Sequence, residues 1–180
     1  MKALKISRKT AKFAVARLMS PVSTIGAAKF GPLSLVNESA PTMPNAEGWH
    51  RIQPRLTGIC GSDLHYFAHG KCGNFVPTQP FILGHEFAGE IVAHGEGVQS
   101  PAIGTRVAVD PSRACGRCKQ CRQGRYNLCP KMVYCGSASV TPPCNGCYAE
   151  YITAPAQNCW PLPDGRYSKS CAAPFSAELR

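Results

Sequence analysis

Four cysteines near the middle of the chain have the spacing of a metal site. Two residues separate each neighbouring pair among the first three, and seven separate the last pair, which gives Cys115, Cys118, Cys121 and Cys129. Zinc favours four tetrahedral ligands, and a two-residue gap lets consecutive thiolates turn onto one ion. Two disulfides or four unrelated thiols are the alternative. We expect a closed structural zinc site that leaves no position for a substrate.

A second group of ligand-type residues, Cys60, His85 and Glu86, comes from two separate parts of the chain. Gly61 and Gly84 stand next to them, where a backbone could approach closely. Three protein ligands would leave one zinc position open for water or substrate, as catalytic zinc requires. The alternative is that Cys60 is a small core residue and His85 a hydrogen-bonded core histidine.

Polar side chains crowd the turn that follows Cys60. Ser62, Asp63 and His65 supply a hydroxyl, a carboxylate and an imidazole, and the run 61–66 predicts a short helix capped by Ser62 or Asp63. Groups of these kinds can relay a proton. Their presence favours the catalytic interpretation of the second group.

The remaining sequence predicts a mainly β protein. With 17 glycines and 16 prolines in 180 residues, short strands and turns are favoured over long helices. Strands are predicted at 3–6, 49–56, 89–93, 106–110 and 148–153, and a short amphipathic helical turn at 13–18. Pro54 predicts that the strand 49–56 lies at a sheet edge. We expect a barrel or folded sheet from which the cysteine segment projects as a lobe.

Composition narrows the partners and the compartment. The formal charge is +10, but several of the basic residues surround the lobe thiols and the rest are scattered without interleaved aromatics, so no nucleic-acid partner is predicted. No apolar stretch approaches a membrane span. The odd count of 11 cysteines at metal-like spacings indicates a reducing compartment, and we predict the cytoplasm. An organelle transit peptide is the alternative, because the first 37 residues are basic and lack acids.

The runs 58–66 and 84–89, together with the cysteine lobe, resemble the zinc-dependent medium-chain alcohol and polyol dehydrogenases over about residues 49–165. The stretch 65–75 is similar to the polyol branch, which includes sorbitol dehydrogenase, and the stretch 110–148 is most similar to L-idonate 5-dehydrogenases. The resemblance implies a GroES-like β-barrel catalytic domain with a four-cysteine zinc lobe. It also implies oxidation of a small-molecule polyol or sugar acid with NAD or NADP, with idonate as the first choice.

The same resemblance assigns metal roles to the second group. It implies that Cys60 and His85 bind a catalytic zinc, so that the chain holds one catalytic and one structural zinc. Glu86 would be a further ligand or a close neighbour that exchanges with water. Asp63 would orient His85 from behind.

The resemblance also implies catalytic roles on the turn after Cys60. Ser62 would accept the proton of the substrate hydroxyl, and His65 would pass it to solvent through the cofactor ribose. Tyr66 would touch the polyol.

By this resemblance, residues 1–48 form an N-terminal strand and a variable insertion, 49–165 the catalytic domain, and 166–180 a divergent tail. Ala173 stands where many relatives carry a metal-binding glutamate. We therefore expect a truncated chain that lacks the Rossmann domain, is inactive alone, and exposes apolar surface that favours self-association or a homo-oligomer. The alternative is a stand-alone zinc-binding module with a structural or interaction role. Cys144 and Cys147 are expected to be free thiols rather than a redox pair.

Overall fold

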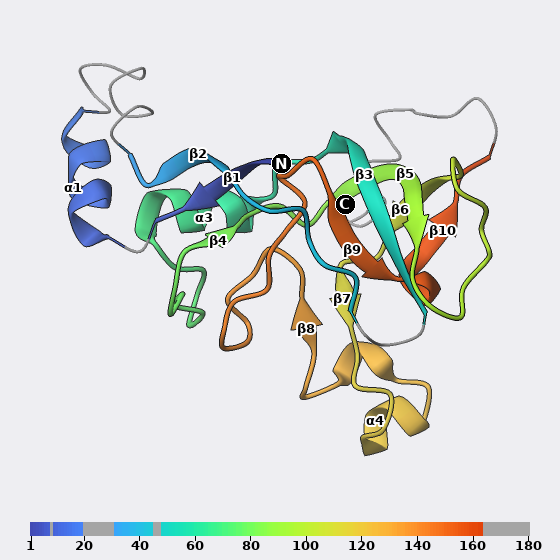
Figure 1. Cartoon of the computed structure of the whole chain (residues 1–180). Coiled ribbons are helices and arrows are strands. Elements are labelled where there is room, and N and C mark those ends of the chain that lie inside the picture. The colour runs from blue at the N-terminus through green and yellow to red at the C-terminus, as the bar shows by residue number, and fades with distance from the viewer. Residues whose placement is uncertain (8, 20–30, 45–47, 164–180) are drawn as a thin grey trace.

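The computed structural model describes residues 1–7, 9–19, 31–44 and 48–163, shown in Figure 1. The expectations for Ala173 and the tail therefore lie outside the described residues. The elements in chain order are β1 (Lys2–Ile6), α1 (Thr10–Met19), β2 (Leu33–Asn37), β3 (Trp49–Thr57), α3 (Gly61–His69), β4 (Phe81–Ile82), β5 (Phe87–His94), β6 (Arg106–Val109), β7 (Ser112–Arg113), α4 (Lys119–Arg122), the 3-10 turn η1 (Tyr126–Leu128), β8 (Val133–Tyr134), β9 (Ile152–Pro155), the 3-10 turn η2 (Ala156–Asn158) and β10 (Cys159–Pro161).

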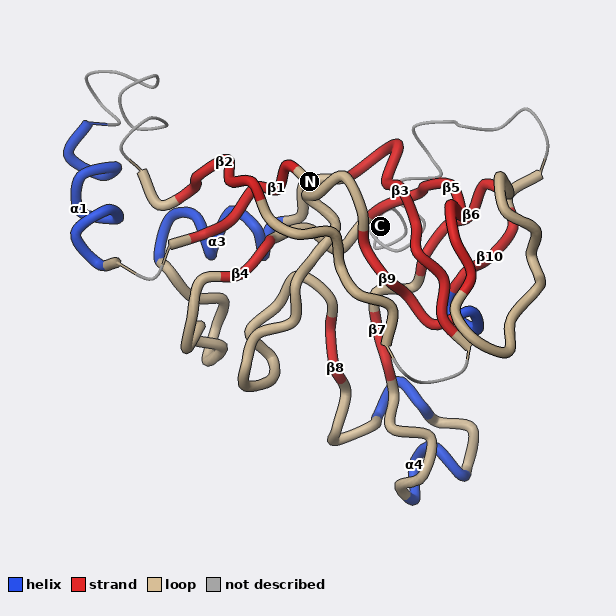
Figure 2. The backbone as a smooth tube through the Cα atoms, viewed as in Figure 1, coloured by secondary structure: helices blue, strands red, loops and turns tan. Residues whose placement is uncertain are grey.

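A five-stranded antiparallel sheet in the order β10-β6-β5-β3-β9 forms the main body (Figure 2). Its inward side chains, among them Ile52, Phe87 and Ile91, are fully buried in one core. Burial alternates along β3 and β9, since successive strand side chains point to opposite faces, whereas β5 and β6 are each buried at three consecutive residues. The predicted mainly β fold is confirmed, and the strands predicted at 89–93 and 106–110 correspond to β5 and β6.

The predicted edge position of the strand at 49–56 is wrong. β3 lies between β5 and β9, but β9 pairs only with Trp49 to Ile52, so it has ended before Pro54. On the other side, the β3–β5 register shifts between Pro54 and Leu56. A proline lacks the backbone N–H that an interior ladder uses, and this irregularity beyond the end of β9 accommodates the loss.

A smaller sheet in the order β2-β1-β4 supports α3. Tyr66 on α3 packs with Phe81 and Ile6 in a second core, and Phe13 on α1 packs against the same core. The strand predicted at 3–6 is confirmed as β1, and the helical turn predicted at 13–18 is confirmed within α1. The strand predicted at 148–153 is confirmed only at its end, where β9 begins at Ile152.

The cysteine segment forms a lobe that leaves the main body through β7 and returns through β8, which pair with each other. Figure 1 shows α4 and the turn after it at the far end of this lobe, away from both larger sheets. The predicted excursion is therefore confirmed. Within the described ranges, no helix is long and apolar enough to cross a membrane.

Candidate functional site

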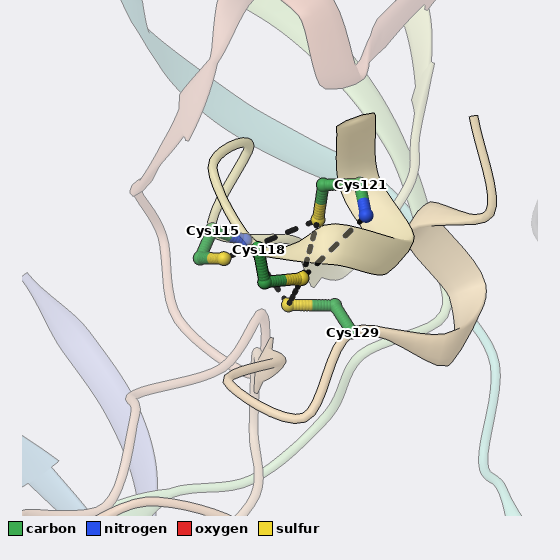
Figure 3. A group of neighbouring side chains, drawn as sticks. All are labelled: Cys115, Cys118, Cys121 and Cys129. Carbon is green, nitrogen blue, oxygen red and sulfur yellow. Dashed lines mark hydrogen bonds between the residues drawn. The ribbon is translucent and has the colours of Figure 1, made fainter. Parts of the chain in front are cut away.

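The four lobe cysteines turn their sulfur atoms toward one another (Figure 3). The Cys118 sulfur lies 3.4 Å from that of Cys121 and 3.9 Å from that of Cys129, and the Cys115 and Cys121 sulfurs are 4.0 Å apart. Four sulfurs held at about 2.3 Å from one zinc are about 3.8 Å apart, whereas a disulfide needs about 2.05 Å. All four are free thiols. The donor set fits one tetrahedral zinc and excludes the two-disulfide alternative in this structure.

Backbone amides lower the pKa of two of the lobe thiols, which favours their metal-binding thiolate form. Hydrogen bonds from the amides of Arg117 and Cys118 lower the pKa of Cys115 to about 6, and the amide of Cys121 lowers that of Cys118. Desolvation, followed by the Cys118 sulfur, raises the pKa of Cys121 to about 12. Because thiolates are the metal-binding form, Cys121 needs a cation beside it before it can ionise at neutral pH.

The second predicted ligand group is also brought together. Cys60 follows β3 at the start of α3, while His85 and Glu86 form the loop between β4 and β5. One ligand atom from each residue lies within 4.8 Å of the others, with His85 buried and the other two half-buried. A thiolate, an imidazole and a carboxylate are all zinc ligands, and three of them leave a position open. The residues present therefore fit a catalytic zinc.

Asp63 joins the two segments that carry these ligands. Its carboxylate accepts the Cys60 N–H at 3.0 Å, which caps α3, and the Gly84 N–H at 3.2 Å. Its Oδ1 faces His85 Nδ1 at 3.8 Å, and that nitrogen is buried without a hydrogen-bond partner. His85 Nε2 faces Ser62 Oγ at 3.5 Å. Asp63 therefore lies on the Nδ1 side of the ring and Ser62 on the Nε2 side, and the orienting role of Asp63 stays a prediction.

Tyr148 belongs to this network, although the sequence analysis assigned it no role in the site. Its hydroxyl donates toward Gly58 O at 2.8 Å and toward Asp63 Oδ2 at 3.0 Å. Burial and the neighbouring Asp63 carboxylate raise the pKa of Tyr148, so the hydroxyl keeps its proton at neutral pH. Tyr148 lies 85 residues from Asp63 in sequence, and no spacing pattern connects them.

A cavity of about 420 Å³ lies beside the second group, with Ser62 and His85 in its wall. Burial, followed by the Asp110 charge, raises the pKa of Tyr134 in the same wall to about 12, so this phenol is neutral. The residues that line the cavity include five that carry hydroxyl groups, Ser62, Tyr66, Tyr134, Ser137 and Ser139, together with apolar ones such as Phe75 and Met132. No lysine or arginine lines the cavity in the part of the chain that the structure describes. Such a wall suits an uncharged ligand.

Two of the predicted catalytic residues take less direct positions. Tyr66 lines the cavity but is buried, and its hydroxyl accepts the Ala138 N–H at 2.9 Å and lies 3.4 Å from Ser137 Oγ. His65 is exposed on α3, does not line the cavity, and has its ring centroid 5.8 Å from that of His69. Contact of Tyr66 with substrate and proton transfer through His65 stay predictions.

The other cysteines separate by environment. Cys147 is buried in the main core, whereas Cys144 is half-buried and accepts a hydrogen bond from Arg113 at 3.5 Å. Both are free, as predicted. Cys72, to which the sequence assigned no role, lines the cavity, and burial followed by the Cys60 charge raises its pKa. A thiol that stays protonated there adds little charge to the cavity.

A strand-built domain that combines a four-cysteine lobe with a second ligand group beside a cavity has the features of a metal-binding domain. Residues 46–164 match the alcohol dehydrogenase GroES-like domain, and the chain belongs to this family. The predicted resemblance to the zinc-dependent alcohol and polyol dehydrogenases is thereby confirmed.

Individual relatives agree with the family. The chain is 46% identical over 130 residues to sorbitol dehydrogenase from Bacillus subtilis (strain 168). The aligned region covers 71% of this chain and 36% of that protein. Its fold is similar to that of L-idonate 5-dehydrogenase from Escherichia coli K-12 MG1655, with a TM-score of 0.71, 27% identity and coverage of 96% of this chain and 44% of that one. It is also similar to a short chain alcohol dehydrogenase from Escherichia coli CFT073 in complex with NADH, with a TM-score of 0.72, 31% identity and coverage of 96% and 41%. The chain thus spans less than half the length of these relatives.

Proposed function

We propose that this chain is the catalytic part of a zinc-dependent dehydrogenase that oxidises a secondary alcohol of a polyol with NAD or NADP. The observation that carries the proposal is the group formed by Cys60, His85 and Glu86, whose ligand atoms lie within 4.8 Å of one another beside a hydroxyl-lined cavity. The sorbitol dehydrogenase relative and the NADH complex of a structural neighbour support the substrate class and the cofactor.

The chain's own residues would take different roles in this reaction. A zinc ion held by Cys60, His85 and Glu86 would supply Lewis acidity toward the substrate oxygen. Ser62 would accept the proton of the substrate hydroxyl, and its distance of 3.5 Å from His85 Nε2 supports this role. His65 lies one helical turn further on the same side of α3 and is exposed, so it can release that proton to solvent.

The cavity wall favours a neutral polyol over a sugar acid. Idonate carries a carboxylate, and such a group is commonly held by arginine or lysine. In the described part of the chain, the cavity offers hydroxyls and aromatic rings but no such cation. We therefore place sorbitol-like or xylitol-like polyols ahead of idonate, which stays a prediction supported by one structural neighbour.

Complete turnover requires a nicotinamide-binding part in addition to these residues, and we propose that the additional length of the relatives corresponds to it. Ile59 and Leu64, 73% and 58% exposed beside Cys60, provide apolar surface of the kind expected where another domain or subunit docks. Location in the cytoplasm remains a proposal, supported by the free state of every cysteine in the described ranges.

A stand-alone zinc module is the second candidate function. The lobe favours it, because all four of its ligands lie between residues 115 and 129 and need no other part of the chain. A protein of this kind would bind zinc in the lobe alone, and its second group would stay without metal.

Cobalt substitution distinguishes the two functions without the cofactor. The full chain is loaded with Co²⁺, and the visible absorption bands of the metal are followed while xylitol or sorbitol is added. We expect two bound ions and a saturable spectral change that disappears in Cys60→Ala and persists in Cys144→Ala, a matched removal of a thiol outside both groups. Binding of one ion only, with no response to polyol, would support the module instead.

A further inference from the structure

Tyr148 contacts both chain segments that supply the second ligand group. Its hydroxyl lies 2.8 Å from the carbonyl oxygen of Gly58, two residues before Cys60. The same hydroxyl lies 3.0 Å from Asp63 Oδ2, the oxygen that also accepts the Cys60 N–H at 3.0 Å. One phenolic proton therefore faces two acceptors, both of which fix the position of the Cys60 turn.

The ring of Tyr148 is held against the other segment. Gly84, immediately before His85, has φ +90°, and a Cβ atom on it would overlap the Tyr148 ring. The Tyr148 N–H donates to Leu83 O at 3.0 Å, and the Cys147 N–H donates to Gly84 O at 2.8 Å. Backbone and ring together leave the hydroxyl little freedom to move.

We propose that Tyr148 is a positioning residue for the open zinc site: its hydroxyl locks Asp63 and the Cys60 turn in the arrangement that Cys60 and His85 need to hold one ion. This inference rests on the proposed function, because it assumes that zinc binds there. The Tyr148 hydroxyl acts through Asp63, which accepts its hydrogen bond and faces His85 Nδ1 at 3.8 Å. Residues that orient ligands in this way typically change metal affinity about 10- to 100-fold when altered.

A merely structural role has to be separated from positioning, because Tyr148 packs against both hydrophobic cores. Tyr148→Phe keeps the ring over Gly84 and removes only the hydroxyl, so packing is retained. Tyr151→Phe makes the same chemical change three residues away, on a tyrosine that lines a different cavity. The four-cysteine lobe serves as an internal control within each protein.

The experiment is a zinc competition titration of the full chain against a chromophoric chelator, for the parent and both variants. The expected result is a 10- to 100-fold loss of zinc affinity at the second site in Tyr148→Phe, with lobe affinity unchanged. Tyr151→Phe should match the parent at both sites.

Three outcomes would overturn the inference or its basis. Equal second-site affinity in Tyr148→Phe and the parent shows that the hydroxyl does not position the ligands. An equal loss at both sites shows that Tyr148 supports the whole fold instead. A parent that binds zinc only in the lobe removes the proposed function itself, and the inference with it.

Discussion

The two ligand groups of this domain are built in opposite ways. The lobe gathers Cys115 to Cys129 from one short segment, and three of its sulfur–sulfur separations, 3.4 to 4.0 Å, are close to the separation of about 3.8 Å in a zinc tetrahedron. The second group draws on two separate turns, and its ligand atoms lie within 4.8 Å of one another. Local turns set the geometry of the first, whereas the packing of the whole domain sets that of the second.

The glycines beside each group show the same difference. Gly116 in the lobe has φ +70° and nothing within 4 Å of where a Cβ would be, so only its backbone conformation demands glycine. Gly84 has φ +90° and is covered by Tyr148. The lobe therefore tolerates changes that the open site does not, and the open site depends on contacts that a variant can remove singly.

Zinc removal should give the largest contrast. Four thiolates bind zinc more tightly than three mixed ligands with an open position, so a chelator should strip the second site first. We expect the lobe zinc to need at least about 100-fold more chelator, a difference of about 2.8 kcal/mol in binding free energy. The measurement follows zinc release by absorbance. Simultaneous release of both ions would contradict the contrast.

Replacing Gly84 or Gly116 by alanine should reveal how differently the chain is packed beside the two ligand groups. Gly84→Ala combines a positive φ with overlap against the Tyr148 ring, and we expect a loss of about 3 kcal/mol or more in the free energy of unfolding. Gly116→Ala meets only the backbone penalty of about 1–2 kcal/mol. Urea denaturation of the zinc-loaded proteins measures both. Equal losses would mean that Tyr148 moves aside at little cost.

Replacing one carboxylate near each ligand group should destabilise the protein less than Gly84→Ala does, and the two replacements should differ in their cost. Asp63 is buried and accepts hydrogen bonds from two backbone amides and the Tyr148 hydroxyl, so Asp63→Asn sets an amide NH₂ against a donor; we expect a loss of about 2 kcal/mol in unfolding free energy. Asp110→Asn is its match at the entrance of the lobe. Ser112 donates both of its bonds to Asp110 Oδ1, so the amide oxygen of asparagine can still accept them, and we expect a loss of at most about 1 kcal/mol from the missing charge. Urea unfolding at fixed zinc tests the pair, and a larger loss for Asp110→Asn would reverse the comparison.

The smallest expected effect is a pH dependence of stability that arises from a histidine pair. The pair lies on β3 and β5, at the ends of these strands that are farther from the open site. His50 and His94 face each other there with their Nδ1 atoms 3.0 Å apart. Burial, followed by the His94 charge, lowers the pKa of His50 in the folded chain. Below about pH 6.5, His50 is therefore protonated to a greater extent in the unfolded chain than in the folded chain. The free energy of unfolding should therefore fall as pH drops below 6.5, by at most about 1.4 kcal/mol per pH unit.

Urea unfolding between pH 8 and pH 5 measures this dependence. His94→Asn keeps a neutral hydrogen-bond partner for His50 and removes its charge, so its pH slope should be shallower than that of the parent. Glu96, exposed in the loop after β5, is present in both proteins, so its titration cancels in the comparison of the two slopes. The strand β9, which pairs with β3 opposite His50, carries no titratable group. The zinc ligands are also common to both, so their acid sensitivity cancels in the difference. Identical slopes would show that the histidine pair does not couple to folding.

The sequence predicted what depends on local spacing. The two-residue gaps between Cys115, Cys118 and Cys121 specify turns that bring thiolates together, and the structure shows them together. The alternation and turn signals likewise predicted the mainly β fold, β1, β5 and β6. Cys60, His85 and Glu86 were grouped by ligand type, and a family resemblance supplied their roles.

What the sequence could not supply depends on the tertiary fold. Pro54 suggested a sheet edge because a single strand does not reveal where its neighbour stops. Tyr148 was missed because its partners Gly58 and Asp63 are distant in sequence and its own neighbourhood predicted only a strand. The hydroxyl-lined cavity was missed for the same reason, since its wall combines residues from α3, the β4–β5 loop and the segment after the lobe.

The most direct test of the two-site account is zinc per chain, measured by elemental analysis of the purified parent, Cys60→Ala and Cys118→Ala. The account predicts two zincs in the parent, with Cys60→Ala keeping only the lobe zinc and Cys118→Ala keeping only that of the open site. One zinc in the parent, unaffected by Cys60→Ala and lost in Cys118→Ala, would contradict it and leave the lobe as the chain's single metal site.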